Sequence, residues 1–512
     1  LAFLTFVLFQ RWFFGPKNTD QGADQTQSGQ SFIAPKSKLE ERPLNKEVDF
    51  IDEKRLSPRV LTDVETDLAT YVFSTDAASL NRLEYKGDVN GNLAGLATVF
   101  PVSDTEREDR CFLVALDKKT PYFYNFLGKK ENEYVVELNY RYDSPNSDFI
   151  VDKKFSVYKK TYKIDLLVEI TPKKALKESY EARLFFPAPV MPALGKNDQM
   201  AAVVINEKGN MDRTLRGSLN DLQGWRMPRL FGADNKYFAH AMIDDPEQFA
   251  QRAYYKVIGE NKMFSILEGP QEKEKKSWTT SFYFGPKEEQ ALVAVDKRLV
   301  KFIEYSGWFA PIANPISKLL MLILRFLYKY LKNYGWAIII LTLIIRLIML
   351  PFTIKAEKSM KQRLEFQKKL EYLQKKYKHD KSALARERAE LIKKHGMPGL
   401  GGCLPLLFQL PIFIALSNLL RSSIELYKAP FILWIKDLSA PDPYYVLPIL
   451  MSVSMLAQAF TADPKSRFMM IAMALVIGPL FASMPAGLGL YIVASVGLGV
   501  LQTFLVKKLK TT

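Results

Sequence analysis

The chain has 512 residues and a formal net charge of +16 at pH 7. Its long apolar runs are concentrated in residues 315–506, whereas residues 15–300 are polar, which predicts a membrane protein with a large water-exposed domain. The histidines lie in separate regions without a catalytic constellation, which argues against an enzyme and predicts neither a cofactor nor a metal site. Cys111 and Cys403 fall in different parts of the chain, so we expect no disulfide between them.

Residues 1–14 are apolar and end in Arg11, Trp12 and Phe14 instead of the small residues that precede a signal-peptidase site. We therefore expect an uncleaved transmembrane anchor that is truncated at its start. Residues 15–55 are rich in Gln, Asp, Ser, Gly and Lys and hold few large apolar side chains. This composition predicts a disordered linker.

Residues 56–300 are expected to form an all-β domain. Apolar and polar residues alternate in 155–172, and two similar runs flank a Gly-Glu-Asn turn in 253–267, as in a hairpin. Many short strands broken by Gly, Pro and Asn predict a sandwich of antiparallel sheets. His240 stands alone near aromatic residues, which is more typical of a packed histidine than of a ligand.

Residues 301–333 are expected to form a linker followed by an amphipathic helix. On a helix, four cations of this segment fall on one stripe: Lys318, Arg325, Lys329 and Lys332. A helix lying in the membrane interface tolerates such a stripe, whereas a spanning helix does not. If the segment spanned, the basic block that follows residue 352 would lie outside the cell, against the positive-inside rule.

The apolar run 336–352 is long enough to cross a bilayer, yet Arg346 lies inside it. An arginine near the middle of a span costs about 2.5–3.5 kcal/mol on insertion scales, so it normally faces water or protein. Thr342 lies one turn earlier on the same face. The alternative is that the long Arg346 side chain reaches an interface along the helix surface.

The stretch 355–398 predicts a cytoplasmic helical hairpin with a basic surface, because fourteen Lys and Arg face six Asp and Glu between residues 355 and 394. A solvated face without a binding role is the alternative, and no nucleic-acid motif accompanies the run. Its position beside the membrane favours docking to anionic lipid or an acidic partner. The docking candidates are Lys368, Lys369, Lys375, Lys376 and Lys378.

Further apolar segments predict four more spans, at 403–420, 443–460, 468–484 and 487–506. Residues 334–506 would then be a five-helix membrane core, followed by a cytoplasmic tail at 507–512. With the N-terminal anchor this makes six spans with both ends in the cytoplasm and the β domain outside.

Polar side chains in these spans suggest a shared cavity, although each of them could instead make an ordinary helix–helix hydrogen bond. No acidic residue lies in the middle of a span, which argues against an ion-coupled transporter and leaves water or a visiting carboxylate as the company of Arg346. The candidate groove residues are Arg346, Thr342, Gln409, Asn418, Tyr491, Ser495, Met469 and Met473. The methionines would offer an adaptable surface or simple core packing.

Two stretches, GGCLPLLFQLPIFIALSNLL and APFILWIKDLSAPDPYYVLPILM, resemble the signature of the YidC membrane protein insertase family. The order of anchor, large domain, interfacial helix and helical core is similar as well. The resemblance implies a periplasmic β-supersandwich and matches Arg346, within TLIIRLIMLP, to the groove arginine of the family. One departure is Met397-Pro398, with two extra residues, where many members have Asn-Pro before Gly-Gly-Cys.

The resemblance also implies a function: insertion and folding of nascent inner-membrane proteins in the bacterial inner membrane, alone or with the Sec translocon. The residues supply the mechanism, a hydrated, positively charged groove that admits a polar terminus while the apolar segment slides along the spans. The expected partners are nascent membrane proteins, the Sec translocon, ribosomes or targeting factors, and anionic lipids, with no direct nucleic-acid recognition. The alternatives are a small-solute transporter or channel with an extracytoplasmic binding domain, and an envelope scaffold.

Overall fold

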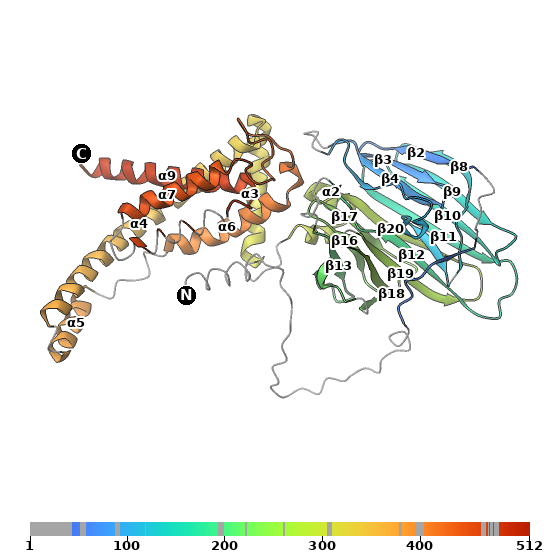
Figure 1. Cartoon of the computed structure of the whole chain (residues 1–512), viewed down its shortest axis with the longest axis horizontal. Helices are drawn as coiled ribbons and strands as arrows, with labels where there is room; N and C mark the ends of the chain where they lie inside the picture. Colours follow the sequence, from blue (N-terminus) through green and yellow to red (C-terminus); the bar gives the residue numbers. More distant parts are fainter. Residues whose placement is uncertain are drawn as a thin grey trace. The chain divides into compact units, whose positions relative to one another are not determined.

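The computed structural model divides the chain into two compact units, Leu1–Ile303 and Glu304–Thr512, which we call the β domain and the helical unit and describe separately (Figure 1). The structure describes the following residues: 43–51, 58–87, 93–117, 119–192, 199–220, 223–259, 262–304, 310–377, 381–395, 404–461, 467–468, 471, 475 and 481–511. The expected anchor at 1–14 and most of the expected linker therefore lie outside the described residues, as does Cys403.

Three sheets build the β domain. From one edge to the other, the seven-stranded sheet consists of β1 (Asp49–Phe50), β7 (Lys119–Thr120), β6 (Leu113–Leu116), β12 (Tyr180–Pro187), β19 (Lys262–Glu272), β18 (Arg252–Ile258) and β15 (Gly224–Arg226). In the same way, the nine-stranded sheet consists of β14 (Met211–Leu215), β13 (Ala201–Ile205), β16 (Leu230–Asp234), β17 (Phe238–Asp244), β20 (Lys276–Pro286), β11 (Lys163–Pro172), β10 (Phe149–Tyr158), β9 (Val135–Asp143) and β8 (Asn125–Glu131). The four-stranded sheet consists of β2 (Leu61–Glu65), β3 (Ala69–Ser74), β4 (Ser79–Tyr85) and β5 (Ala97–Val99).

The alternation of apolar and polar residues in the sequence corresponds to alternating buried and partly exposed side chains in the strands. In β10 and β11 every second side chain is buried, and the two strands pair antiparallel from Phe149 opposite Pro172 onward. The expected hairpin is present as β18 and β19, also antiparallel. Because the described strands pair antiparallel except β1 with β7, the prediction of an antiparallel sandwich is confirmed.

The structured part of the β domain begins earlier than the sequence predicted. Residues 43–51 belong to the stretch expected to be a disordered linker, yet Asp49–Phe50 form β1, which pairs in parallel with β7. Leu44 and Val48 pack against the buried cluster around Phe185 and Tyr254. Arg183 and the Tyr254 hydroxyl also donate to backbone carbonyls of this segment. A composition rule does not detect such contacts with distant residues.

The β domain closes with two short helices, α2 (Glu289–Val295) and η4 (Lys297–Phe302), whose Leu292, Leu299 and Phe302 are buried. Two further 3₁₀ turns lie at Arg107–Asp109 and Arg216–Ser218. His240 is fully buried, stacks on Phe284 and is hydrogen-bonded at both ring nitrogens, so its interpretation as a packed residue is confirmed.

The helical unit is built from long apolar helices and a basic hairpin. Its described elements are α3 (Ala310–Leu331), α4 (Tyr334–Lys376), α5 (Lys381–His395), α6 (Leu404–Ser422), η6 (Ile424–Leu426), α7 (Val446–Thr461) and α9 (Ala486–Thr511). The main packing partners are α3 with α6 and α4, α4 with α9, and α7 with α9. Most of the span expected at 468–484 lies outside the described residues.

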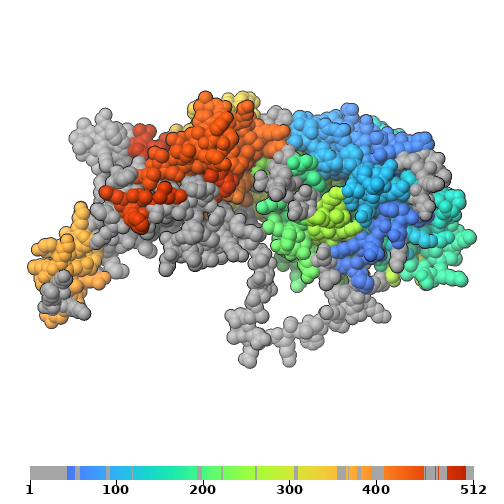
Figure 2. Space-filling view, viewed as in Figure 1, coloured from blue at the N-terminus to red at the C-terminus, as the bar shows by residue number. Residues whose placement is uncertain are grey.

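Helix α4 is one continuous helix of 43 residues, although the sequence suggested a span at 336–352 separate from the hairpin that follows. Asn333 caps it by accepting hydrogen bonds from the backbone of Gly335 and Trp336. Pro351 lies inside the helix without ending it. The distal part of α4 and α5 therefore project as one hairpin beyond the other described helices of this unit (Figures 1 and 2).

Two described helices are long and apolar enough to cross a membrane: α3, and residues 334–354 of α4. Ala486–Gln502 of α9 is a shorter apolar helix. Because length and composition would let α3 span, its expected interfacial position remains a prediction. Two cations of its stripe have acidic partners, with Lys318 Nζ 2.9 Å from Glu304 Oε1 and Arg325 Nη2 2.6 Å from Glu425 Oε1.

Candidate functional site

The centre of the candidate site is the contact between Arg346 on α4 and Ser495 on α9. The guanidinium of Arg346 donates two hydrogen bonds to the Ser495 hydroxyl, from Nε at 3.0 Å and from Nη2 at 2.7 Å. Ser495 is buried, whereas Arg346 is only partly buried. The serine therefore holds the cation in one place while part of the side chain remains accessible.

Gly499, one turn beyond Ser495, leaves room for the guanidinium. A Cβ atom at this position would lie 3.4 Å from Nη1 of Arg346 and 3.6 Å from Cζ, which is ordinary contact distance. Alanine would therefore fit at this position, but a longer side chain would occupy the volume that the guanidinium fills. On successive turns of α9, Ser495 accepts the hydrogen bonds of the guanidinium, and Gly499 leaves free the volume that the guanidinium occupies.

Two more polar contacts fix the same face of α9. Gln409 on α6 donates through Nε2 to the Tyr491 hydroxyl, and Gln502 donates through Nε2 to Thr353 Oγ1 of α4 at 2.8 Å. The three α9 residues that helical spacing places on one face thus all bond to α4 or α6. Thr353 was not predicted as a site residue, because its partner is 149 residues away in the chain.

The electrostatics of the site differ from those of an ordinary buried arginine. Within the part of the chain that the structure describes, no carboxylate lies within ion-pair distance of Arg346. A serine hydroxyl accepts hydrogen bonds but carries no charge, so it orients the guanidinium without neutralising it. The arrangement therefore presents an oriented, uncompensated positive charge between apolar helices.

Other predicted groove residues are placed less favourably. Thr342 is fully buried and its hydroxyl donates to the Ile338 carbonyl at 2.7 Å, so it does not line an open cavity next to Arg346. Asn418 lies in the last two turns of α6 and is partly buried. Met469 and Met473 lie outside the described residues. The structure thus joins Arg346 with Ser495 and Gln409 with Tyr491.

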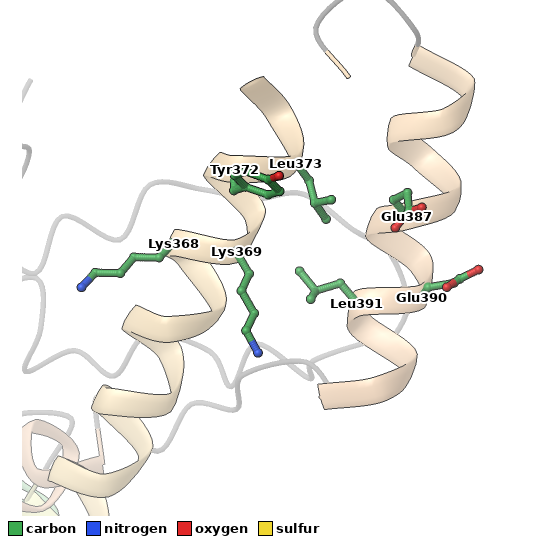
Figure 3. A pocket seen from close by; sticks show the side chains of 7 residues that line it. All are labelled: Lys368, Lys369, Tyr372, Leu373, Glu387, Glu390 and Leu391. Atoms are coloured by element: carbon green, nitrogen blue, oxygen red, sulfur yellow. The ribbon is translucent and has the colours of Figure 1, made fainter. Parts of the chain in front are cut away.

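The basic hairpin holds a cavity of about 380 Å³ between α4 and α5. Figure 3 shows Leu373 and Leu391 facing each other across it, with Lys369 extending into the space and Lys368 pointing away. Glu387 and Glu390 complete its border on α5. Lys375 and Lys376 are exposed, and Lys378 lies outside the described residues. The hairpin therefore combines a basic surface with an apolar floor.

An ion pair between half-buried Arg325 and buried Glu425 in the helical unit was not foreseen from the sequence. Glu425 of η6 is buried, accepts from Arg325 of α3 at 2.8 Å and from the Tyr334 hydroxyl at 2.9 Å. These contacts join α3, the beginning of α4 and the end of α6. A glutamate directly after an apolar span, together with an arginine in an amphipathic helix, was the available signal. No group of three His, Cys, Asp or Glu among the described residues could hold a metal ion.

Known proteins match both units. A family model described as 60Kd inner membrane protein covers residues 326–512, and one described as YidC periplasmic domain covers residues 118–319. A membrane protein insertase YidC from Geobacter metallireducens is 31% identical over 462 residues, which are 87% of this chain and 85% of the relative. The insertase of the same name from Citrifermentans bemidjiense is 44% identical over 230 residues, which are 44% and 42% of the two chains.

Among solved structures, an active YidC insertase with its first transmembrane domain resolved covers 88% of this chain and 93% of its own, at 20% identity and a TM-score of 0.37. The sequence relatives carry the assignment, because the Geobacter metallireducens protein matches along most of both chains. The chain is accordingly an inner-membrane protein with a periplasmic β-sandwich domain and a helical core of apolar helices. It belongs to the YidC membrane protein insertase family.

Proposed function

We propose that this protein inserts hydrophobic segments of nascent membrane proteins into the inner membrane; its relatives are named membrane protein insertases. The observation that carries the proposal is Arg346, a cation oriented by Ser495 between apolar helices without a carboxylate partner among the described residues. No covalent step and no nucleotide is required, because partitioning of an apolar segment into lipid is itself favourable.

The charge of Arg346 lowers the free-energy cost of bringing an acidic group of the client into the membrane. An acidic residue at the centre of a span costs about 2.5–3.5 kcal/mol on insertion scales. A carboxylate about 4 Å from a guanidinium gains about 4 kcal/mol at an effective dielectric constant of about 20. The two magnitudes are similar, so a fixed cation offsets the penalty of bringing a polar or acidic terminus of the client into the membrane.

The apolar part of the client can pack on exposed side chains of the two helices that carry this site, α4 and α9. Leu347 and Ile348 directly follow Arg346 and are 58% and 62% exposed. On α9, Val500 and Leu501 are similarly exposed beside Gly499. A client helix packed there would leave water while its polar end stays near the guanidinium. We further propose that Gln409 and Tyr491 border the groove and that Met469 and Met473 offer an adaptable wall to the client.

The projecting hairpin is proposed as the docking surface for ribosomes, targeting factors or anionic lipid, through Lys368, Lys369, Lys375, Lys376 and Lys378. Its exposed cations and its position apart from the other helices support this role. Cooperation with the Sec translocon belongs to the same proposal. Deleting residues 356–396 with a short linker should leave the protein in the membrane but stop insertion of ribosome-bound clients.

The test of the central proposal compares variants that change charge with variants that change only geometry. Arg346→Ala should lower insertion of a client with an acidic terminus at least tenfold, and Arg346→Lys should retain more activity, because the charge matters more than the fork of donors. Ser495→Ala keeps the charge and removes its anchor, so a smaller loss is expected. Equal insertion by Arg346→Ala and the parent protein would contradict the proposal.

Gly499 provides a matched pair of variants that leaves Arg346 in place. Gly499→Leu should displace the guanidinium from Ser495 and lower insertion, whereas Gly499→Ala fits the available space and should retain activity. Insertion is measured as protease protection of the client in proteoliposomes. Equal activity of the two variants would show that the position of the guanidinium does not matter.

Access of water to the site is tested at Gln409, because Thr342 is buried. In a background without Cys111 and Cys403, a cysteine introduced by Gln409→Cys should react with a water-soluble maleimide from the cytoplasmic side only. Reaction from both sides would favour a channel. No reaction, while a cysteine from Tyr372→Cys on the hairpin reacts, would mean that the groove is not hydrated.

A further inference from the structure

The loop between α6 and α7 presents apolar side chains at its apex in a fixed conformation. Leu433 is 79% exposed and Ile432 is 43% exposed. The backbone around them is nevertheless hydrogen-bonded, from Phe431 N to Ile435 O at 2.9 Å and from Ile435 N to Ile432 O at 3.1 Å. Leu433 has a φ of +54°, a left-handed conformation that is unfavourable for leucine and persists only when its surroundings impose it.

The base of this loop is anchored to the beginning of α4. Phe431 packs so closely on Gly335 that a Cβ atom there would lie 2.0 Å from the Phe431 ring. The Phe431 ring also meets Trp336 edge-on, with centroids 5.5 Å apart, and Asn333 Nδ2 donates to the Phe431 carbonyl at 3.2 Å. The position of the apex is therefore set by the first turn of α4.

The other side of the loop is anchored to the beginning of α7. Asp442 is buried, accepts from Trp434 Nε1 at 3.0 Å and caps the helix by accepting from Leu447 N at 2.8 Å. Leu438 N donates to Ala429 O at 3.0 Å across the loop. The protein thus stabilises a conformation in which Ile432 and Leu433 point out of the fold.

The composition of the loop matches the border between lipid and water. The loop connects the end of α6 at Ser422 with the start of α7 at Val446. It also contacts the start of α4 at Tyr334, through Asn333. Lys428 and Lys436 flank the apex on either side in the chain. Tyr444 and Tyr445 are exposed and follow the loop in the sequence. Trp336 is also exposed and contacts Phe431 of the loop. Aromatic rings and lysines together are typical of the membrane interface.

We propose that residues 431–436 form a wedge that inserts Ile432 and Leu433 into the lipid leaflet at this end of the helical unit. The occupant is lipid: acyl chains take the two apolar side chains, and phosphate groups accept from the flanking lysines. In the predicted topology this is the periplasmic leaflet. The wedge fixes the depth of α4, and thereby of Arg346 three turns below its start, independently of whether the protein inserts clients.

Lipid fits this apex better than a protein partner does. Two side chains offer too small an apolar area for a stable protein interface, which buries about 800 Å² on each partner. The apolar helix that follows the loop, α7, also exposes apolar side chains, namely Ile449, Leu450 and Val453. The ammonium groups of Lys428 and Lys436 can donate charge-assisted hydrogen bonds to lipid phosphates on either side of the apex.

The test measures the depth of the apex in the full-length protein without an insertion assay. A cysteine from Leu433→Cys is labelled with an environment-sensitive nitrobenzoxadiazole dye, and the protein is placed in vesicles of phosphatidylethanolamine and phosphatidylglycerol. Cys111 is 1% exposed and remains unlabelled, and the parent protein reports background from Cys403. A spin label on the acyl chains should quench the dye at 433 at least twofold more than the dye on Tyr372→Cys, which is 65% exposed on the hairpin.

Equal quenching of the two dyes by the acyl-chain spin label would overturn the proposal. Equal quenching of the dyes at 433 and 372 by iodide in the water would also overturn it. A dye shielded from both iodide and acyl spin label would identify a protein partner instead and also overturn it. Leu433→Gly supplies a variant that folds at least as well, because glycine adopts a positive φ without strain. A dye on Ile432→Cys should then be quenched less in the Leu433→Gly protein than in the protein with Leu433.

Discussion

Two cations of the β domain, Arg252 and Lys287, and Arg346 of the helical unit have different kinds of partner. In the β domain, Arg252 forms two hydrogen bonds of 2.9 Å with the buried carboxylate of Glu268, and Lys287 lies 2.8 Å from buried Asp234. In the helical unit, Arg346 has a serine hydroxyl instead of a carboxylate. Arg252 and Lys287 are buried and neutralised by carboxylates, so they maintain the fold, whereas Arg346 is oriented by a neutral group and only partly buried, so it remains available to a visiting group.

Glu268→Ala should give the largest effect on stability and tests one side of this comparison. Both Arg252 and Glu268 are buried, so removing the carboxylate leaves an uncompensated charge, and we expect the free energy of unfolding to fall by about 3–5 kcal/mol. Hydrogen exchange of the β18 and β19 amides in the full-length protein measures this. Arg346→Ala is the matched variant, and its effect on stability should be under about 1 kcal/mol. Equal destabilisation would show that Arg346 is structural.

Glu425→Ala should have the next largest effect, because this buried carboxylate of the helical unit is paired with a cation, as Glu268 is in the β domain. Its removal takes two charge-assisted contacts from Arg325 and one from Tyr334, and we expect a loss of about 2–3 kcal/mol. Thermal unfolding of the detergent-purified protein measures it. Lys318→Ala, which removes a pair on the exposed face of α3, serves as control and should change stability little. Unchanged stability in Glu425→Ala would contradict a structural role.

Histidine protonation gives a smaller, pH-dependent effect confined to the β domain. Burial lowers the pKa of His240 to about 3, from an ordinary value near 6.5. The folded protein keeps the ring neutral, and its Nδ1–H group donates to the Pro187 carbonyl at 2.9 Å. Below pH 6.5 the unfolded chain binds a proton that the folded chain does not, so stability falls with falling pH, by about 2 kcal/mol at pH 5 relative to pH 8.

The measurement is hydrogen exchange of the β17 and β20 amides at both pH values, corrected for intrinsic exchange rates. His240→Gln removes the titrating group, so the difference between variant and parent isolates its contribution from that of other acids. A parent and a His240→Gln protein with the same pH dependence would show that His240 is not the responsible group.

Gln502→Leu should give the smallest effect, because it removes one neutral hydrogen bond between α9 and α4. Such bonds between membrane helices contribute about 0.6 kcal/mol on average. We expect a similar loss of stability and nearly unchanged insertion, since the bond with Thr353 holds the helices together without orienting Arg346. A loss of insertion comparable with that of Ser495→Ala would extend the functional site to this second contact.

Features that depend on a local pattern could be predicted from the sequence. Alternation along β10 and β11, the apolar span around Arg346 and the basic composition of the hairpin are each contained in one short stretch, because burial repeats every second residue in a strand and a span needs only its length. The same patterns misjudged residues 43–51, whose order comes from pairing with β7, and did not predict that α4 continues through Pro351.

Which side chains contact each other could not be predicted, because it depends on how distant segments pack. The serine that orients Arg346 lies 149 residues further along the chain, and Arg325 and Glu425 are 100 residues apart. Helical spacing placed Tyr491, Ser495 and Gln502 on one face but gave no partner to any of them, and it grouped Thr342 with Arg346 although Thr342 is buried and bonded within its own helix. A helix face is fixed by local geometry, whereas its partner is fixed by packing between segments that are distant in sequence.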